Sequence, residues 1–155
     1  MNTDATLQID LPDSDATEQL GFLIGQRLCG GEVIELAGDV GSGKTTFTKG
    51  LARGAGSRDV VSSPSFTISQ EYEAKKFTIV HFDFYRLSEA GVVGQEMVEY
   101  IGNEAYVTVI EWGETVEKLL PLTRLKVSLL YTSEHGRTAT LVAPEPLTHL
   151  TQGVL

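Results

Sequence analysis

Hydrophobic and polar residues alternate at the start of the chain and then change period. Every second residue between positions 5 and 11 is apolar, which predicts a strand with one face on a core. Apolar residues then recur at spacings of three and four, as on one face of an amphipathic helix. These residues are Leu20, Leu23, Ile24 and Leu28. The oxygen-bearing side chains at residues 13–15 can cap this helix at its start, and the glycine pair at residues 30–31 is expected to end it.

The rest of the chain consists of short apolar runs separated by turns. Six further strands are predicted, at residues 33–37, 66–72, 77–84, 106–110, 125–131 and 138–142. Two further helices are predicted, at residues 44–53 and 88–101. A tight turn at residues 133–136 should join the last two strands as a hairpin. The early order of strand, turn and helix predicts an α/β fold: a mixed sheet, parallel in part, flanked by helices and with antiparallel strands at its edges.

Composition and charge narrow the class of protein. The 155 residues are expected to form one domain, residues 1–155. Twelve Lys and Arg against 21 Asp and Glu give a net charge of −9, which argues against a broad nucleic-acid-binding surface, because phosphate binding depends on clustered basic residues. Any role on nucleic acid should therefore run through a protein partner, without strong direct binding of the nucleic acid.

The sequence also bears on location. The longest segment without a charged residue, residues 60–70, is far shorter than the roughly 20 apolar residues that a membrane helix needs. The first residues lack the positive flank of a signal peptide. Cys29 is the single cysteine, expected on the first helix, so that no intramolecular disulfide can form. We therefore expect a cytoplasmic protein with no membrane segment.

A glycine-rich segment follows the strand predicted at residues 33–37. Residues 38–45 read Gly-Asp-Val-Gly-Ser-Gly-Lys-Thr and match G-x-x-x-x-G-K-[ST] in full. In this motif the glycines let consecutive backbone N–H groups point at phosphate oxygens, and the helix that follows adds its positive end. Lys44 is then expected to reach the β- and γ-phosphates, and the Thr45 hydroxyl to ligate Mg²⁺. The segment therefore predicts a nucleoside triphosphate site of the P-loop class.

The residues expected to bind the nucleotide come from this segment and the position after it. They are Val40, Gly41, Ser42, Gly43, Lys44, Thr45 and Thr46. Lys44 is also a candidate catalytic residue. It is expected to face solvent when no nucleotide is bound, so that Lys44→Ala would lose nucleotide affinity without unfolding the protein.

Two carboxylates stand at the ends of apolar runs and are the remaining catalytic candidates. Asp83 follows residues 79–82, and Glu111 follows residues 107–110. A P-loop enzyme needs a carboxylate beside the loop to hold Mg²⁺ or to orient the attacking water. The pattern leaves open which of the two orients water. The alternative for each is an ordinary solvated charge at a strand end.

Other side chains near these motifs carry weaker signals. Trp112 follows Glu111 directly, and the pattern alone favours core packing for it. Arg86 and Arg137 are the arginines expected nearest to a γ-phosphate, although surface solvation is the ordinary role of both. The three histidines share no metal-ligand spacing and receive no functional role. They are His81, His135 and His149.

Several classes of P-loop protein can be compared with the sequence. No Asn-Lys-x-Asp segment is present to read guanine, and no Leu-Ser-Gly-Gly-Gln segment typical of transporter ATPases is present. A small-molecule phosphotransferase of the P-loop class remains an alternative, which the few, scattered arginines weaken. A nucleotide-dependent binding module, in which ATP only switches conformation, is a third possibility.

Four ordered motifs together resemble the TsaE (YjeE) family. They are residues 38–47 (Gly-Asp-Val-Gly-Ser-Gly-Lys-Thr-Thr-Phe), 63–67 (Ser-Pro-Ser-Phe-Thr), 81–87 (His-Phe-Asp-Phe-Tyr-Arg-Leu) and 110–112 (Ile-Glu-Trp). The resemblance covers residues 17–141. It implies a Mg²⁺-dependent ATPase, weakly active alone, that is needed for threonylcarbamoyladenosine beside the anticodon of tRNAs reading A-starting codons. It also implies a partner, the TsaD–TsaB pair, which transfers the threonylcarbamoyl group and which ATP hydrolysis resets.

The resemblance extends to single positions. Thr45 and Glu111 resemble the Mg²⁺ ligands of the family, and Asp83 resembles the acid near the γ-phosphate. Trp112 resembles the tryptophan beside the active site, which replaces core packing as its expected role, and Arg137 resembles an arginine near the nucleotide.

Two segments depart from the family pattern. Ser65 stands where the family usually has Thr, which keeps a hydroxyl group at that position. Residues 89–100 follow the family's Glu- and Leu-rich pattern only loosely.

Overall fold

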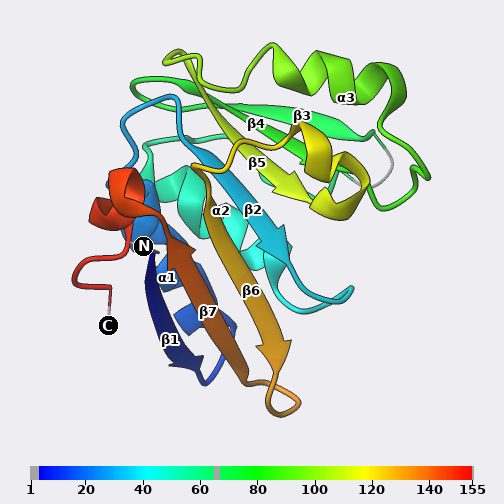
Figure 1. The fold of residues 1–155 in the computed structure, drawn as a ribbon. Helices are drawn as coiled ribbons and strands as arrows, with labels where there is room; N and C mark the ends of the chain where they lie inside the picture. The colour runs from blue at the N-terminus through cyan, green and yellow to red at the C-terminus, as the bar shows by residue number, and fades with distance from the viewer. Residues whose placement is uncertain (1–3, 65–66, 155) are drawn as a thin grey trace.

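The structure, a computed structural model, describes residues 4–64 and 67–154 and is built on a seven-stranded sheet with strand order β1-β7-β6-β2-β5-β4-β3 (Figure 1). The strands are β1 (Ala5–Leu11), β2 (Val33–Ala37), β3 (Ser69–Glu73), β4 (Thr78–Asp83), β5 (Tyr106–Glu111), β6 (Leu125–Tyr131) and β7 (Arg137–Ala143). The helices are α1 (Ser14–Gly25), α2 (Lys44–Gly54) and α3 (Gly91–Val98), with 3₁₀ helices η1 (Gly113–Leu119) and η2 (Glu145–Leu150).

The sheet is parallel in its centre and antiparallel at both edges. β2 pairs in parallel with β5 and β6, and β4 pairs in parallel with β5. β7 runs antiparallel to β6 and β1, and β3 runs antiparallel to β4. This arrangement confirms the predicted mixed α/β sheet. Because the carboxyl ends of parallel strands lie at one edge, the segments that follow β2, β4 and β5 are brought together there.

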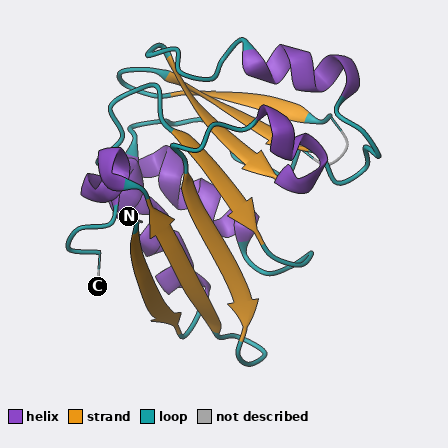
Figure 2. Ribbon diagram, viewed as in Figure 1, coloured by secondary structure: helices purple, strands orange, loops and turns teal. Residues whose placement is uncertain are grey.

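Helices lie on both sides of the sheet (Figure 2). Ile24 of α1 and Phe47 of α2 share one buried core cluster with Leu36 of β2. Met97 of α3 shares a second cluster with Val33, at the other end of β2. The two clusters arise because successive residues of a strand point to opposite faces, so the nearly continuous apolar run of β2 is buried on both sides.

Helices α1 and α2 approach each other through glycines. Four of these residues are at the contact: Gly21, Gly25, Gly50 and Gly54. A Cβ atom at Gly21 would overlap the carbonyl oxygen of Phe47, and one at Gly50 would overlap that of Glu18. The backbones therefore touch directly at these positions, and α2, which begins at the end of the glycine-rich segment, is held close against α1.

The end of the first helix differs from the prediction. α1 ends at Gly25, before the glycine pair at residues 30–31, because the chain tightens there: the Arg27 N–H donates to the carbonyl of Ile24 at 2.9 Å. This turn buries Leu28, so the apolar residue at this position does not require a longer helix. Cys29 consequently lies beyond the helix and is exposed, and its predicted position on α1 is wrong.

Other element bounds also shift. The helix predicted at residues 88–101 is confined to α3, since the N–H groups of Glu99 and Tyr100 bond to carbonyls only three residues back. β3 starts later than the predicted strand at residues 66–72, after Ile68 with a φ of 70°, which is not extended backbone. Ser65 lies outside the described residues. Within the described ranges no helix combines the length and apolar character needed to span a membrane.

Candidate active site

A cavity of about 440 Å³ opens where β2, β4 and β5 end. Its lining from the glycine-rich segment and α2 consists of Val40, Gly41, Gly43, Lys44, Thr45 and Thr46. Its lining from other segments consists of Ser63, Asp83, Tyr85, Arg86, Glu111 and Trp112. The predicted loop residues other than Ser42, and both predicted acids, thus surround one space.

The glycine-rich loop (residues 38–43) joins β2 directly to α2. Gly41 and Gly43 have φ angles of 81° and 108°, a region in which glycine is strongly favoured. Ser42 is fully buried, and its hydroxyl oxygen has no hydrogen-bond partner among the residues described. α2 begins at Lys44 without a side-chain cap, so its first turn presents backbone N–H groups and the positive end of the helix dipole at the cavity. This is the local geometry that binds anions.

Lys44 is held inside the protein. Its side chain is 7% exposed, and its Nζ donates a hydrogen bond to the carbonyl oxygen of Gly38 at 2.6 Å. The same nitrogen lies 3.8 Å from Oε1 of Glu111 and 4.4 Å from the ring centre of Trp112. The prediction that Lys44 faces solvent is therefore wrong, because the loop curls back and offers its first carbonyl to the ammonium group.

The two candidate acids are neighbours across the sheet. Asp83 ends β4 and Glu111 ends β5, and the register of these parallel strands pairs them directly. Both are buried, with 3% exposure. One Asp83 carboxylate oxygen accepts the N–H of Tyr85 at 2.9 Å, which fixes the chain just after β4. Two carboxylates from different strands therefore reach the same cavity.

Glu111 is bound from behind by a buried histidine. The Nε2 of His81 lies 2.6 Å from Oε2 of Glu111, and its Nδ1 lies 3.3 Å from the hydroxyl of Tyr72. His81 is fully buried. Burial, reinforced by the negative charge of Glu111 and opposed by a hydrogen bond to the carbonyl of Ser62, raises the pKa of Tyr72 to about 12. A neutral phenol, an imidazole and a carboxylate thus form a chain that fixes how Glu111 faces the cavity.

Trp112 lies at the rim of the cavity in an unusual backbone conformation. Its φ of 58° is left-handed, which is uncommon for a bulky residue. The ring packs against Tyr85, with ring centres 4.8 Å apart, and against the ammonium group of Lys44. Trp112 is partly buried and lines the cavity, and its role beside a bound nucleotide stays a prediction.

Arg137 supports the loop from outside the cavity. Its guanidinium donates to the carbonyl oxygens of Ser42 at 3.1 Å and Gly41 at 3.2 Å. It also lies 4.0 Å from the ring centre of Tyr131, whose hydroxyl donates to the carbonyl of Val40 at 3.3 Å. These contacts fix the loop through its carbonyl groups. A direct contact of Arg137 with nucleotide stays a prediction.

Comparison with known proteins decides the family. A family model described as "Threonylcarbamoyl adenosine biosynthesis protein TsaE" matches residues 11–139. The chain belongs to the TsaE family. TsaE proteins take part in tRNA threonylcarbamoyladenosine biosynthesis, as the names of the relatives state.

Individual relatives agree with this assignment. The tRNA threonylcarbamoyladenosine biosynthesis protein TsaE of a Nostoc species is 36% identical over 142 residues, covering 90% of this chain and 87% of the relative. Its counterpart from Bacillus subtilis is 39% identical over 114 residues, covering 73% and 70%. The crystal structure of Bacillus subtilis YdiB superposes with a TM-score of 0.83 at 29% identity, covering 99% of this chain and 97% of that one. The resemblance drawn from the four motifs is thereby confirmed.

In this TsaE chain the structure also brings in residues without a predicted role. His81 contacts Glu111, Tyr72 contacts His81, and Tyr131 contacts the glycine-rich loop. The sequence held one signal for His81: it stands two residues before Asp83, so both side chains lie on the same face of a strand. Tyr72 and Tyr131 carried no comparable signal: Tyr72 meets His81 across the paired strands β3 and β4, and Tyr131 meets the carbonyl of Val40, which is 91 positions away.

Proposed function

We propose that this TsaE chain binds and hydrolyses ATP with Mg²⁺ and acts on the TsaD–TsaB pair in the synthesis of threonylcarbamoyladenosine in tRNA. One observation carries the proposal: the glycine-rich loop, Lys44 and the carboxylates of Asp83 and Glu111 surround the same cavity. The names of the relatives support the pathway.

The residues around the cavity fit ATP and Mg²⁺. The N-terminus of α2 and the ammonium group of Lys44 offer positive potential to a triphosphate. Magnesium prefers oxygen ligands, and the Thr45 hydroxyl and the Glu111 carboxylate are the proposed ligands from this lining. When bound, Mg²⁺ would neutralise the charge that develops on the phosphate oxygens.

Each side chain around the cavity would then have its own role in hydrolysis. Lys44 would exchange the carbonyl of Gly38 for phosphate oxygens, so that an internal hydrogen bond is replaced by an external one. Asp83 or Glu111 would accept a hydrogen bond from the attacking water and orient it. His81 would keep the Glu111 carboxylate in one orientation throughout. Trp112 and Tyr85 would exclude bulk water from one side of the cavity.

The net charge and the position of the arginines support a role for a protein partner. A net charge of −9 does not favour tight direct binding to tRNA. Arg137 is engaged with loop carbonyls, which leaves Arg86 as the arginine in the cavity lining, and a partner would add to the charge stabilisation of the transition state. Weak turnover by the isolated chain, raised by TsaD–TsaB, is the expected behaviour.

The test replaces the chromosomal copy with variants and measures threonylcarbamoyladenosine in bulk tRNA by nucleoside mass spectrometry. Phosphate release by each purified variant is measured with TsaD–TsaB present. Lys44→Ala and Thr45→Ala should abolish both signals, whereas Lys49→Ala, an exposed position on the same helix, should leave them unchanged. The Lys44→Ala variant lacks the hydrogen bond to the carbonyl of Gly38, which lowers its free energy of unfolding by about 1.5–3 kcal/mol. Circular dichroism must therefore verify that this variant is folded.

Other results would redirect the proposal. Unchanged modification after clean depletion would exclude the pathway role. Transfer of labelled phosphate to a metabolite, with no release to water, would favour the phosphotransferase alternative. Full modification with both Asp83→Asn and Glu111→Gln would mean that ATP binding alone is sufficient.

A further inference from the structure

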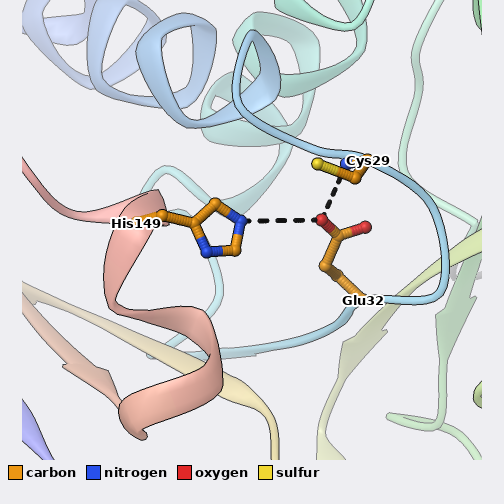
Figure 3. Close-up of side chains that lie close together, drawn as sticks. All are labelled: Cys29, Glu32 and His149. Atoms are coloured by element: carbon orange, nitrogen blue, oxygen red, sulfur yellow. Dashed lines mark hydrogen bonds and ion pairs between the residues drawn. The ribbon is translucent and has the colours of Figure 1, made fainter.

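Three side chains with metal-ligating atoms meet at a place that the nucleotide site does not use (Figure 3). Cys29 and Glu32 lie in the connection from α1 to β2, and His149 lies in η2. The cysteine sulfur, a carboxylate oxygen and an imidazole nitrogen all lie within 4.8 Å of one another. Glu32 precedes β2, whereas the cavity opens after β2, so the two sites are separated by that strand, about 17 Å at 3.3 Å per residue.

The carboxylate of this group is fixed in advance. Glu32 is 7% exposed, and its two oxygens accept the backbone N–H groups of Cys29 at 2.7 Å and Gly30 at 2.6 Å. Each carboxylate oxygen has two lone pairs, so each keeps one for a further partner. The Nε2 of His149 lies 4.0 Å from Oε2 of Glu32 (Figure 3). Hydrogen bonds of this kind orient ligands in metal sites.

The two segments are also held together by other contacts. Leu147 and Leu150 anchor η2 in the core with 7% and 0% exposure. A guanidinium nitrogen of Arg27 donates to the carbonyl of Leu150 at 3.5 Å. The side chain of His149 remains 45% exposed and Cys29 is exposed, so an ion can reach them from solvent and both can rotate. The thiol donates to the carbonyl of Arg27 at 3.6 Å, which is a long contact.

We infer that Cys29, Glu32 and His149 form a binding site for one Zn²⁺ ion, with water at the fourth position. Thiolate sulfur, imidazole nitrogen and carboxylate oxygen are zinc ligands at bond lengths of about 2.0–2.3 Å. Mg²⁺ and Ca²⁺ prefer oxygen alone, so this mixed set discriminates against them. Binding releases the thiol proton to water and draws the three ligand atoms to within about 3.5 Å of one another, which rotation of the two exposed side chains permits.

The site would join the connection before β2 to η2, near the C-terminus. Zinc would therefore stabilise the folded chain and leave the nucleotide cavity unaltered. Zinc that acted through the cavity would instead compete with Mg²⁺ and ATP, so nucleotide affinity separates the two possibilities.

The test uses the full chain, freed of metal by chelation, and titrates Zn²⁺ against a chromophoric chelator. Co²⁺ serves as a second probe because its bond to a thiolate gives a near-ultraviolet charge-transfer band. Cys29→Ser and His149→Ala are the site variants. His135→Ala is a matched control, since His135 also lies 4.0 Å from a carboxylate, that of Glu134, on a distant hairpin without a cysteine.

We expect one Zn²⁺ per chain, an affinity at least about tenfold weaker in each site variant, and wild-type affinity in His135→Ala. Zinc should raise the melting temperature of wild type and of His135→Ala only, with ATP affinity unchanged. The inference fails if Cys29→Ser binds Zn²⁺ like wild type, or if His135→Ala loses as much affinity as His149→Ala. It also fails if zinc joins two chains through Cys29 with His149→Ala unaffected.

Discussion

His81 offers a way to disturb Glu111 without touching the cavity. Its side chain is buried behind Glu111 and is not part of the cavity lining. In His81→Gln the amide nitrogen takes roughly the place of Nε2 and can still donate to Glu111. In His81→Asn the amide reaches only the place of Nδ1, so the Glu111 hydrogen bond is lost. The two variants therefore differ mainly in this one contact.

The expected magnitude follows from the 2.6 Å contact between His81 and Glu111. A hydrogen bond to a charged group contributes about 1.5–3 kcal/mol. If about 2 kcal/mol of this hydrogen-bond energy holds Glu111 in the orientation needed for hydrolysis, loss of the bond slows hydrolysis roughly 30-fold. The same loss should lower the melting temperature by about 4–8 °C in a chain of this size.

The assay is phosphate release with TsaD–TsaB at saturating ATP, and ATP affinity is measured from the fluorescence of Trp112, which lines the cavity. His81→Asn should lose turnover with ATP affinity within about twofold of wild type, and His81→Gln should recover most of the turnover. Wild-type turnover in His81→Asn would refute the positioning role. Equal losses in both variants, in parallel with stability, would reduce His81 to a structural residue.

Two further outcomes concern stability. Burial raises the pKa of Tyr72 from 10.0 to about 12. The contribution of the neutral phenol to the free energy of unfolding is therefore complete below pH 10 and is lost as the pH rises to about 12. Urea unfolding of wild type and Tyr72→Phe from pH 8 to 12 should therefore converge above pH 10, and parallel curves would contradict this. Gly50→Ala would push α2 away from Glu18 of α1, an overpacking cost of about 1–3 kcal/mol. Its melting temperature should fall well below that of Lys49→Ala, and equal values would show that the helices separate freely.

The periodic parts of the fold could be predicted from the sequence. Alternation and β-branched runs identified the strands, because those residues pack on a sheet whatever their partners are. The ends of elements were less predictable. α1 stops at Gly25, since a tightened turn buries Leu28 equally well, and the left-handed conformation of Ile68 delays β3. The 3₁₀ helices were not predicted, because six or seven residues are too few to show a clear periodicity.

In the candidate site, too, local features could be predicted from the sequence and contacts between distant residues could not. The glycine-rich loop is a local motif, so its geometry follows from eight consecutive residues. The burial of Lys44 and the contact of His81 with Glu111 depend on pairing across 67 and 30 positions, which spacing along the chain does not encode. Asp83 and Glu111 were found individually, but only the register of β4 and β5 makes them neighbours.

That register has a consequence for how the protein can vary. The backbone hydrogen bonds between β4 and β5 fix the positions of the two carboxylates. The connection between these strands, which contains α3, leaves the end of β4 and returns to the start of β5. Insertions or substitutions within this connection leave the spacing of the two acids intact. The loose match of residues 89–100 to the family pattern is therefore compatible with an unchanged pairing of Asp83 and Glu111.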